Sequence, residues 1–588
     1  MIDSARLLKD LQRLLRSLED DLRQRLEEHP ELDAQVKAEY DRARGRGRTG
    51  QTYSVWRDEY LTQVAVHWIL GAVFVRFLED NEFLPEPWLS GPGKRLNLAR
   101  DRHQAFFMAN PAATDRDYLL ASFEEVRRHP VTAALFDERH NPIYRLGPSA
   151  DGARALVELL RKVDPDTAGL VHDFTDAARG TRFLGDLYQD LSESARKRFA
   201  LLQTPEFVEE FILDRTLTPA IEEFGLSEVR LIDPACGSGH FLLGAFTRLL
   251  ALWQRNEPGL NERDQAQKAL DQVYGVDLNP FAVAIARFRL LIAALGASGV
   301  ERLSDTPDFK MNLAAGDSLL HGPRPGSVVM HQQYLLGADP LLHVYETEDA
   351  DELRRILGQS YHVIVGNPPY ITPKDPALND AYRHLFGSCY MKYSIAVPFT
   401  ERFFDLALAP APGNLSPAGF VGLITSNSFM KREFGKKLIE GYFPRWDLTH
   451  VIDSAGAYIP GHGTPTVILV GRNRPPVAHT VRTVMGIRGE PALPDVPAEG
   501  LVWTAILAQL DRAGSIGTYV SVSDLPRERL HSHPWSLAGG GASDLKERVE
   551  LARRCCLGDI SESIGITLFT LEDDAYLIPP EAARRRRL

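Results

Sequence analysis

Apolar and charged positions follow a helical spacing through the first part of the chain. Charged residues separate six leucines that would share one helix face: Leu7, Leu8, Leu11, Leu14, Leu15 and Leu18. Residues 60–78 form a second, strongly apolar run. Its most apolar stretch, 64–75, falls far short of the roughly 20 residues of a membrane span, so a buried helix is predicted. We therefore expect residues 1–195 to form an N-terminal helical domain.

The hydrophobic pattern changes near residue 200, where short apolar runs begin to alternate with helical stretches. Five runs lead into Asp, Asn, Thr or Ser: VRLIDPA, QVYGVDL, YHVIVGN, GFVGLIT and LTHVIDS. Helices are predicted between most of them, for example over 241–253 and 282–294. This alternation indicates βαβ units and a largely parallel sheet, and ligands bind at the carboxyl edge of such sheets. Residues 196–475 are therefore expected to form a Rossmann-like α/β domain.

Composition narrows the class of protein. The 588 residues are 44% hydrophobic and 25% charged, as in a globular protein. Four cysteines are too few and too badly spaced for a disulfide framework, which favours a reduced cytoplasmic setting. Since the formal net charge is −12, contact with nucleic acid must come from local patches. Arg42, Arg44, Arg46 and Arg48 alternate with Ala or Gly in a segment expected to be exposed and flexible; a phosphate contact and a plain solvated loop both stay open.

A strand, a tight turn and a helix are predicted within LIDPACGSGHF, residues 231–241. The strand ends at Asp233, and glycines in the turn let the backbone approach a ligand where a β-carbon would clash. The spacing is not a dinucleotide fingerprint, because the glycine after Gly237 and Gly239 is Gly244, and no Walker lysine follows. A purely structural turn is the alternative to a ligand site.

An acidic residue ends the next strand, in YGVDLNP. Asp277 is placed to accept hydrogen bonds from ribose hydroxyls, as the equivalent residue does in dinucleotide folds. The 44 residues between Asp233 and Asp277 exceed the roughly 20 of those folds. A helical detour over 254–272 accounts for the excess.

The tetrapeptide NPPY, residues 367–370, follows a further strand. Its two prolines fix the backbone, so the Asn367 side chain and the Pro368 carbonyl are rigidly held acceptors that could face one amino group. Tyr370 offers a π face to a base. An amine conjugated to a purine is a poor nucleophile, and two acceptors that draw its hydrogens out of the ring plane favour attack on a methyl sulfonium. NPPY alone could be only a turn, but its place after the other motifs favours this chemistry.

These motifs, in this order, resemble those of N6-adenine DNA methyltransferases over residues 195–475. The resemblance implies a site-specific enzyme that transfers a methyl group from S-adenosylmethionine to adenine in double-stranded DNA, without a metal. It implies that the catalytic residues are Asn367, Pro368, Pro369 and Tyr370. It implies a cofactor site made of Thr204, Pro205, Asp233, Ala235, Gly237, Gly239, Phe241, Asp277, Leu278, Asp317 and Ser318.

Two further segments bear on DNA. Lys431 and Arg432 follow the run GFVGLIT and are candidates for contacts with DNA phosphates, although a solvated helix start explains them equally well. The loop 460–466 loosely resembles the late target-base motif of the same family.

The N-terminal helical region and the sequence after residue 520 resemble a narrower group, the methyltransferases of bacteriophage-exclusion (BREX, phage-growth-limitation) systems. This resemblance implies that the chain marks self DNA within a multi-protein defence system. Residues 564–570 and 573–576 resemble the opening of a target-recognition domain, so 476–588 is expected to be a linker and a shortened recognition region. Other defence proteins or a separate recognition subunit are then the expected partners. Two alternatives stay open: a non-catalytic scaffold that binds cofactor and DNA, and an NPPY enzyme acting on RNA or protein glutamine.

Overall fold

The structure, a computed structural model, describes residues 2–138, 141–176, 180–191, 204–306, 308–323, 349–461 and 463–537, with short stretches between 539 and 561. The chain divides into two compact units, Met1–Leu537 and Ala538–Leu588. The described part of the second unit includes the short helix α21 (Leu557–Ile560). Residues 564–576, which resemble a recognition domain, lie outside the described residues.

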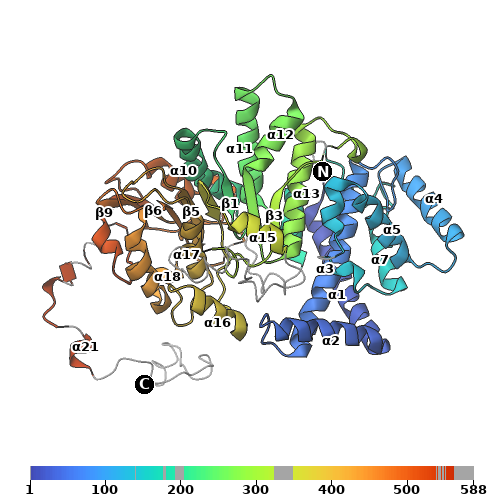
Figure 1. Ribbon diagram of the computed structural model, residues 1–588, viewed down its shortest axis with the longest axis horizontal. Helices are drawn as coiled ribbons and strands as arrows, with labels where there is room; N and C mark the ends of the chain where they lie inside the picture. The colour runs from blue at the N-terminus through green and yellow to red at the C-terminus, as the bar shows by residue number, and fades with distance from the viewer. Residues whose placement is uncertain are drawn as a thin grey trace, which may run out of the picture. The chain divides into compact units, whose positions relative to one another are not determined.

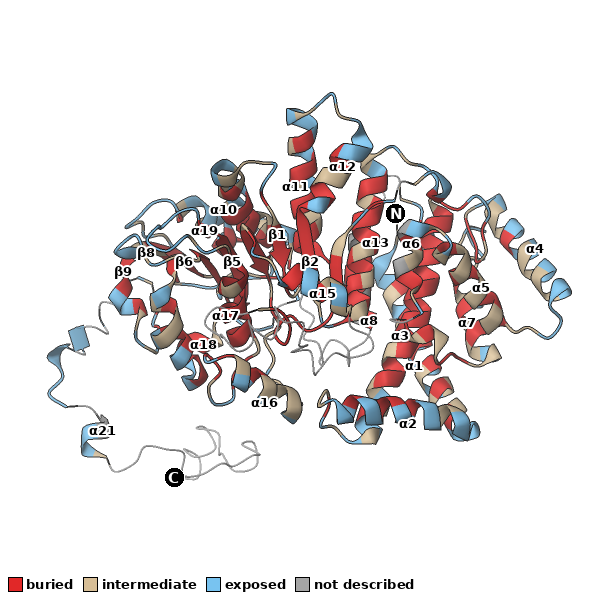
Figure 2. Cartoon of the chain, in the orientation of Figure 1, coloured by how far each residue is buried: buried red, intermediate tan, exposed pale blue. Residues whose placement is uncertain are grey.

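The first part of the chain is helical, as predicted. Its described helices are α1 (Ser4–Glu28), α2 (Pro30–Gly45), α3 (Tyr53–Asp80), α4 (Lys94–Ala109), α5 (Asp115–Arg127), α6 (Pro130–Ala133), α7 (Ala150–Leu160) and α8 (Arg182–Leu191). Five of the six leucines predicted to share one face of α1 are buried, and Leu8 is half-buried. The apolar run of the sequence becomes α3, whose residues are buried over most of its length (Figure 2). α3 and α13 (Pro280–Ala297) are long and apolar enough to cross a membrane. However, 94% and 67% of their most apolar stretches are buried inside the protein, as is usual for core helices.

The arginine segment differs from the flexible stretch that was expected. Arg42 and Arg44 lie in the last turns of α2. Val36, Tyr40 and Ala43 bury their side chains at helical spacing, and this apolar stripe keeps the chain helical as far as Gly45, after which Arg46 and Arg48 lie in a turn.

The described strands form one nine-stranded sheet in the order β3-β2-β1-β4-β5-β7-β6-β8-β9 (Figure 1). The strands are β1 (Leu231–Asp233), β2 (Val273–Asp277), β3 (Asn312–Ala315), β4 (Val363–Gly366), β5 (Phe420–Ser426), β6 (Asp447–Asp453), β7 (Thr466–Arg472), β8 (Thr480–Gly486) and β9 (Val520–Pro526). β1 to β5 pair in parallel, and β7 is antiparallel to β5 and β6. All five predicted strands are present, and the order confirms the α/β, Rossmann-like fold class.

Helices cover both faces of the sheet. One face carries α10 (Glu206–Phe224), α11 (His240–Asn256), α12 (Glu262–Asp271), α13 and α19 (Leu501–Gln509), and the other carries α15 (Ala350–Leu357) and α17 (Ala396–Leu406). Strand side chains alternate between the two cores: Leu231 and Val363 join the first, and Ile232 and Ile364 join the second. Two helices follow strands at the carboxyl edge, α16 (Pro376–Leu385) after β4 and α18 (Ser428–Lys431) after β5.

The sheet extends further than the sequence pattern indicates. β3, β7, β8 and β9 are absent from the sequence prediction, and β8 lies inside the Pro- and Gly-rich stretch 472–500. The helical region also shares a core with the sheet's helices, because the rings of Phe74 and Phe77 pack at 4.8 and 5.7 Å from the ring of Phe288 on α13. Ring packing on α13 and strand pairing by β8 and β9 therefore cross the domain boundaries expected at 195 and 475.

Candidate functional site

Four polar side chains belong to one edge of the sheet. Asp233 and Asp277 end β1 and β2, Asp317 follows β3, and Asn367 follows β4. Because β3, β2, β1 and β4 are parallel neighbours in that order, these side chains form a row at the carboxyl edge. The structure thus brings together the residues that separate sequence motifs singled out.

The turn after β1 has one packed side and one open side. φ is positive at Gly237 (52°) and at Gly239 (80°), a conformation that favours glycine. A Cβ at Gly239 would lie 2.9 Å from the Cβ of Ala286 on α13, whereas a Cβ at Gly237 would meet no atom within 4 Å. A ligand can therefore lie against the backbone at Gly237.

Two buried side chains fix this turn from outside it. The Arg289 guanidinium donates to the Ser238 carbonyl at 2.7 Å, and the Ser318 hydroxyl donates to the Pro234 carbonyl at 2.6 Å. Sequence reasoning missed Arg289. The available signal was an arginine within the apolar helix ARFRLLIAAL, because a buried arginine must find acceptors for its N–H groups.

Asp277 joins the turn to β2. Its two carboxylate oxygens accept the backbone N–H groups of Gly237 and Asn279, each at 2.9 Å. Burial and, to a smaller extent, the charge of Asp317 raise the pKa of Asp277 to about 6, against the opposing effect of these N–H donors. Asp277 is therefore mostly ionised at neutral pH, and its remaining lone pairs can accept further hydrogen bonds. Burial also raises the pKa of Asp233 well above its ordinary value.

Asp317 is buried and held by both of its oxygens. One oxygen accepts the backbone N–H groups of Leu319 and Leu320 at 2.9 and 3.3 Å. The other accepts the hydroxyl of Tyr382, on α16, at 2.6 Å. Sequence reasoning did not single out Tyr382, and its distance of 65 residues from Asp317 gives no local signal.

The NPPY segment lies directly against the turn after β1. A Cβ at Gly366 would come within 2.7 Å of Asp233 Oδ1, so the residue before Asn367 must be very small. The Tyr370 hydroxyl donates to Asn367 Oδ1 at 2.5 Å. Burial raises the pKa of Tyr370 well above its ordinary value, so this hydroxyl stays a donor. The sequence pattern predicts an acceptor at Asn367 and a π face at Tyr370, but not the bond between them.

The start of α10 lies near the same turn. Glu209 of α10 packs against Gly244 of α11, and Asp214 pairs with Arg248 at 2.7 Å, so the two helices run parallel. Thr204 and the proline after it, at the start of α10, therefore lie near the start of α11, where the glycine turn ends. Thr204 is buried, as is Phe241 in the first turn of α11.

The remaining predicted residues lie at the same edge or close to it. Ala235 is half-buried in the glycine turn, and Leu278 is 39% exposed just after Asp277. Lys431 and Arg432 are exposed at the end of α18. The loop 460–466 reaches the end of β5, where the Asn427 N–H donates to the Pro465 carbonyl at 3.0 Å.

Comparison with known proteins adds a family and relatives. Residues 271–457 match the model of the Eco57I restriction-modification methylases. This span contains Asp277, Asp317 and NPPY, whereas the glycine turn lies before it.

Over its whole length the chain is 50% identical to the adenine-specific methyltransferase PglX of Streptomyces coelicolor, of which it covers 49%. It is 26% identical, over 65% of its length, to the type II methyltransferase M.PaeR7I of Pseudomonas aeruginosa, of which it covers 56%. The chain thus spans about half the length of these relatives. The cryoEM structure of a DrdV–DNA complex aligns with a TM-score of 0.47 and 15% identity, over 89% of this chain and 44% of that chain.

Proposed function

We propose that this chain methylates adenine N6 in double-stranded DNA. Residues 271–457 match the model of the Eco57I restriction-modification methylases, and the whole chain is 50% identical to part of an adenine-specific methyltransferase. One observation carries the proposal: Asn367 and Pro368 follow β4 directly beside the glycine turn after β1. Methylation of an exocyclic amine needs hydrogen-bond acceptors for the amine close to a bound methyl donor, and this arrangement provides both places.

The residues of the edge fit S-adenosylmethionine, which supplies an electrophilic methyl group on a positively charged sulfur when bound. The open side of Gly237 leaves room against the backbone, and the neighbouring carboxylates suit a cationic ligand. Asp277 would accept hydrogen bonds from the ribose hydroxyls, and Asp317 from the adenine amino group of the cofactor. The partly exposed Leu278 offers apolar surface beside them. Thr204, Pro205 and Phe241 would complete the pocket at the start of α10 and α11.

Asn367 and Pro368 would orient the amino group of the target base. A paired adenine cannot reach this edge, so the base must leave the helix at a cost of about a few kcal/mol. Stacking on Tyr370 would offset part of that cost. Asn367 Oδ1 and the Pro368 carbonyl would accept the two N6 hydrogens and aim the nitrogen lone pair at the neighbouring cofactor site. Because all of these groups are fixed before the base arrives, positioning accounts for most of the rate.

We place this activity in the cytoplasm, in the marking of self DNA by a phage-defence system. The BREX resemblance of the sequence supports that role, as does the similarity to PglX. Lys431 and Arg432 would contact phosphates of the DNA. The proposed organisation is a helical domain over 1–195, a catalytic domain over 196–475 and a region over 476–588 that leads into target recognition.

The test is transfer of labelled methyl from S-adenosylmethionine to unmethylated DNA, with wild type, Asn367→Ala and Asn97→Ala compared. Asn97 is exposed on α4 and serves as the matched control. Loss of one preorganised hydrogen-bonding group at a reacting atom costs roughly 10²–10³-fold in rate. We therefore expect label on adenine N6 with wild type and Asn97→Ala, and a loss of that order with Asn367→Ala.

Cofactor binding, measured as a rise in melting temperature, should survive in Asn367→Ala. Label on RNA or protein but not on DNA would overturn the choice of substrate. Stabilisation by the cofactor with no transfer to any substrate would favour a scaffold instead.

A further inference from the structure

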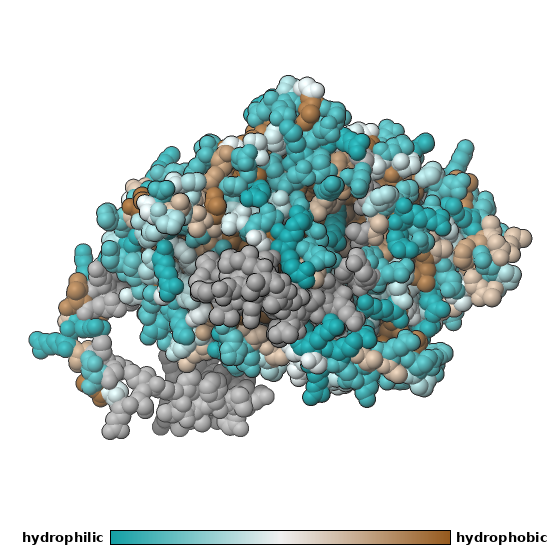
Figure 3. Space-filling model, in the orientation of Figure 1, coloured by the Kyte–Doolittle hydropathy of each residue, from teal (hydrophilic) through white to brown (hydrophobic). Residues whose placement is uncertain are grey.

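The C-terminal end of α2 carries a group of arginines at the surface. Arg42, Arg44 and Arg46 are exposed, and Arg48 is half-buried just beyond them. The neighbouring Asp41 is also exposed, so the group keeps a positive balance in a protein whose net charge is −12. In Figure 3 the surface over α2, at the lower right, is mostly hydrophilic.

The turn after these arginines is fixed to the catalytic half of the chain. The backbone N–H of Gly50 donates to Asp375 Oδ2 at 2.8 Å, and Asp375 also caps α16 by accepting the N–H of Ala377 at 2.9 Å. A Cβ at Gly50 would lie 3.1 Å from Pro376, so the turn packs tightly on the start of that helix. At the next residue, the Tyr40 hydroxyl of α2 donates to the Gln51 carbonyl at 2.7 Å. The arginines are thus held by a defined turn rather than by a free loop.

The same turn lies close to the proposed cofactor site. Gly50 contacts the start of α16 through Asp375, and Tyr382 on the same helix donates its hydroxyl to Asp317. Since α16 begins six residues after Tyr370, the turn that follows the arginines also contacts the segment that leaves NPPY.

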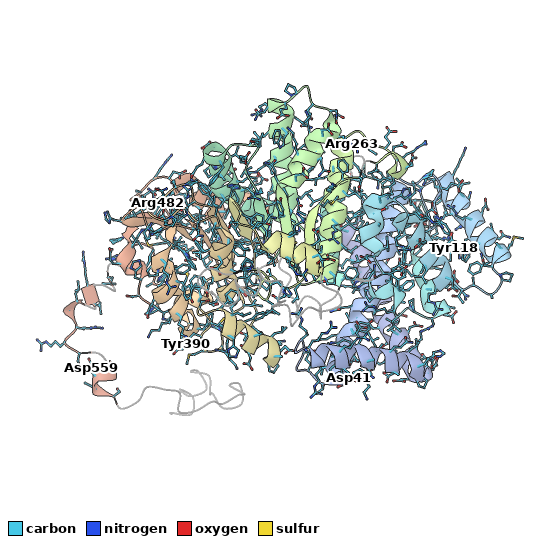
Figure 4. All side chains as sticks on the ribbon, in the orientation of Figure 1. Asp41, Tyr118, Arg263, Tyr390, Arg482 and Asp559 are labelled. Carbon is cyan, nitrogen blue, oxygen red and sulfur yellow. The ribbon has the colours of Figure 1, made fainter. Side chains whose placement is uncertain are left out.

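We propose that Arg42, Arg44 and Arg46 form a second phosphate-binding wall, which grips the backbone of the DNA whose adenine enters the NPPY pocket. The inference rests on the proposed function and names the surface that would bring its substrate to the site. The opposite wall would be the exposed cations after β4 and β5: Lys374, Arg383, Lys392, Lys431 and Arg432. Figure 4 shows Asp41 on α2 and Tyr390 near α16 and α18 at the same lower edge of the view.

Charge chemistry favours a polyanion over an acidic protein as the occupant. Guanidinium groups bind phosphate oxygens through two parallel hydrogen bonds, and duplex DNA presents phosphates on both sides of an extruded base. Cations at the end of α2 and on the segments after β4 and β5 would match that geometry. Contacts of this kind release counterions, so they leave a signature in the salt dependence of binding.

The experiment measures DNA affinity between 50 and 200 mM salt for three proteins. They are the wild type, the triple variant Arg42→Gln, Arg44→Gln, Arg46→Gln, and a charge-matched control, Arg255→Gln, Arg263→Gln, Arg302→Gln. The control arginines are exposed on or beside α11, α12 and α13, and Figure 4 places Arg263 at the edge opposite Asp41. Melting temperatures verify that all three proteins are folded.

Each phosphate contact contributes about 0.9 to the slope of log affinity against log salt, so the α2 variant should lose up to about 2.7 of that slope. Its fall in affinity over this fourfold salt range then shrinks by up to about 40-fold relative to wild type. The control should keep the wild-type slope. Equal slopes in the two triple variants, or no binding of duplex DNA by wild type, would overturn the inference.

Methyl transfer, measured in parallel, separates the two proposals. Transfer by wild type with equal slopes in both variants rejects the arginine wall and leaves the methyltransferase. The predicted loss of slope without transfer supports the wall and rejects the activity.

Discussion

The hydrogen bond between Tyr370 and Asn367 leads to a prediction that separates the ring of Tyr370 from its hydroxyl. The hydroxyl occupies Asn367 Oδ1 at 2.5 Å, the same oxygen that would accept from the target amine. Entry of the base must therefore share or replace this bond. Tyr370→Phe removes the competitor and keeps the ring, whereas Tyr370→Ala removes both.

The two substitutions should affect kcat/KM differently. A neutral hydrogen bond contributes about 1 kcal/mol net, so its removal should leave kcat/KM unchanged or raise it by up to about fivefold. Stacking of a base on an aromatic ring contributes about 1–3 kcal/mol, so Tyr370→Ala should lower kcat/KM by about 5- to 150-fold. The assay is methyl transfer to unmethylated DNA at limiting DNA concentration, with cofactor saturating.

The phenylalanine variant is the decisive one. If Tyr370→Phe loses as much activity as Tyr370→Ala, the hydroxyl itself is required and the competition argument fails. Because burial raises the pKa of Tyr370 well above its ordinary value, the ratio of wild-type to Tyr370→Phe rates should also stay constant from pH 6 to 9. A ratio that changes across this range would mean that the hydroxyl ionises and would contradict the same reasoning.

Three further predictions concern the cofactor edge. Gly239 has a positive φ and packs against α13, so Gly239→Ala should lower the free energy of unfolding by about 1–3 kcal/mol in denaturant titrations. Gly237→Ala meets no neighbouring atom and should mainly weaken cofactor binding, measured by calorimetry. Burial raises the pKa of Asp277 to about 6, and its carboxylate must be ionised to accept two hydroxyl donors, so cofactor affinity should be full above pH 6 and fall about tenfold per pH unit below it. Asp277→Asn should remove this pH dependence. A pH dependence that persists in this variant would mean that another group titrates. Tyr382→Phe removes a donor to charged Asp317, worth about 1.5–3 kcal/mol, and should weaken cofactor binding about tenfold or more while leaving DNA affinity unchanged.

The elements that could be predicted from the sequence are those with a strong local pattern. Five strands and the long helices could be predicted from hydrophobic periodicity, because each has apolar side chains that pack in a core. β8 has a local composition dominated by the Pro and Gly residues around it, and its place is set by pairing with β6 and β9. The insertion of β7 between β5 and β6 likewise depends on pairing between distant segments, which periodicity does not report.

The residues of the candidate site also fall into two groups, those with a local sequence signal and those without one. Asp233, Asp277 and Asn367 are marked by strand ends and turns, so their motifs were visible in the sequence. Arg289 and Tyr382 act on the site from helices 51 and 65 residues away from their partners, and their partners follow only from the fold. The helical ending of α2 was missed because its apolar stripe is interrupted by arginines and glycines.

The helical region supports the edge of the sheet directly, at several points. A Cβ at Gly185 of α8 would come within 2.7 Å of Ser238 Oγ, so this helix packs against the back of the glycine turn. On the other side, Gly50 binds Asp375 at the start of α16, and Tyr382 on the same helix binds Asp317. The proposed cofactor site is therefore held between two contacts from the first 195 residues. A change in how those residues meet the sheet would move the glycine turn and Asp317 together, so DNA bound on α2 and cofactor bound at the edge should influence each other's affinity by the same factor.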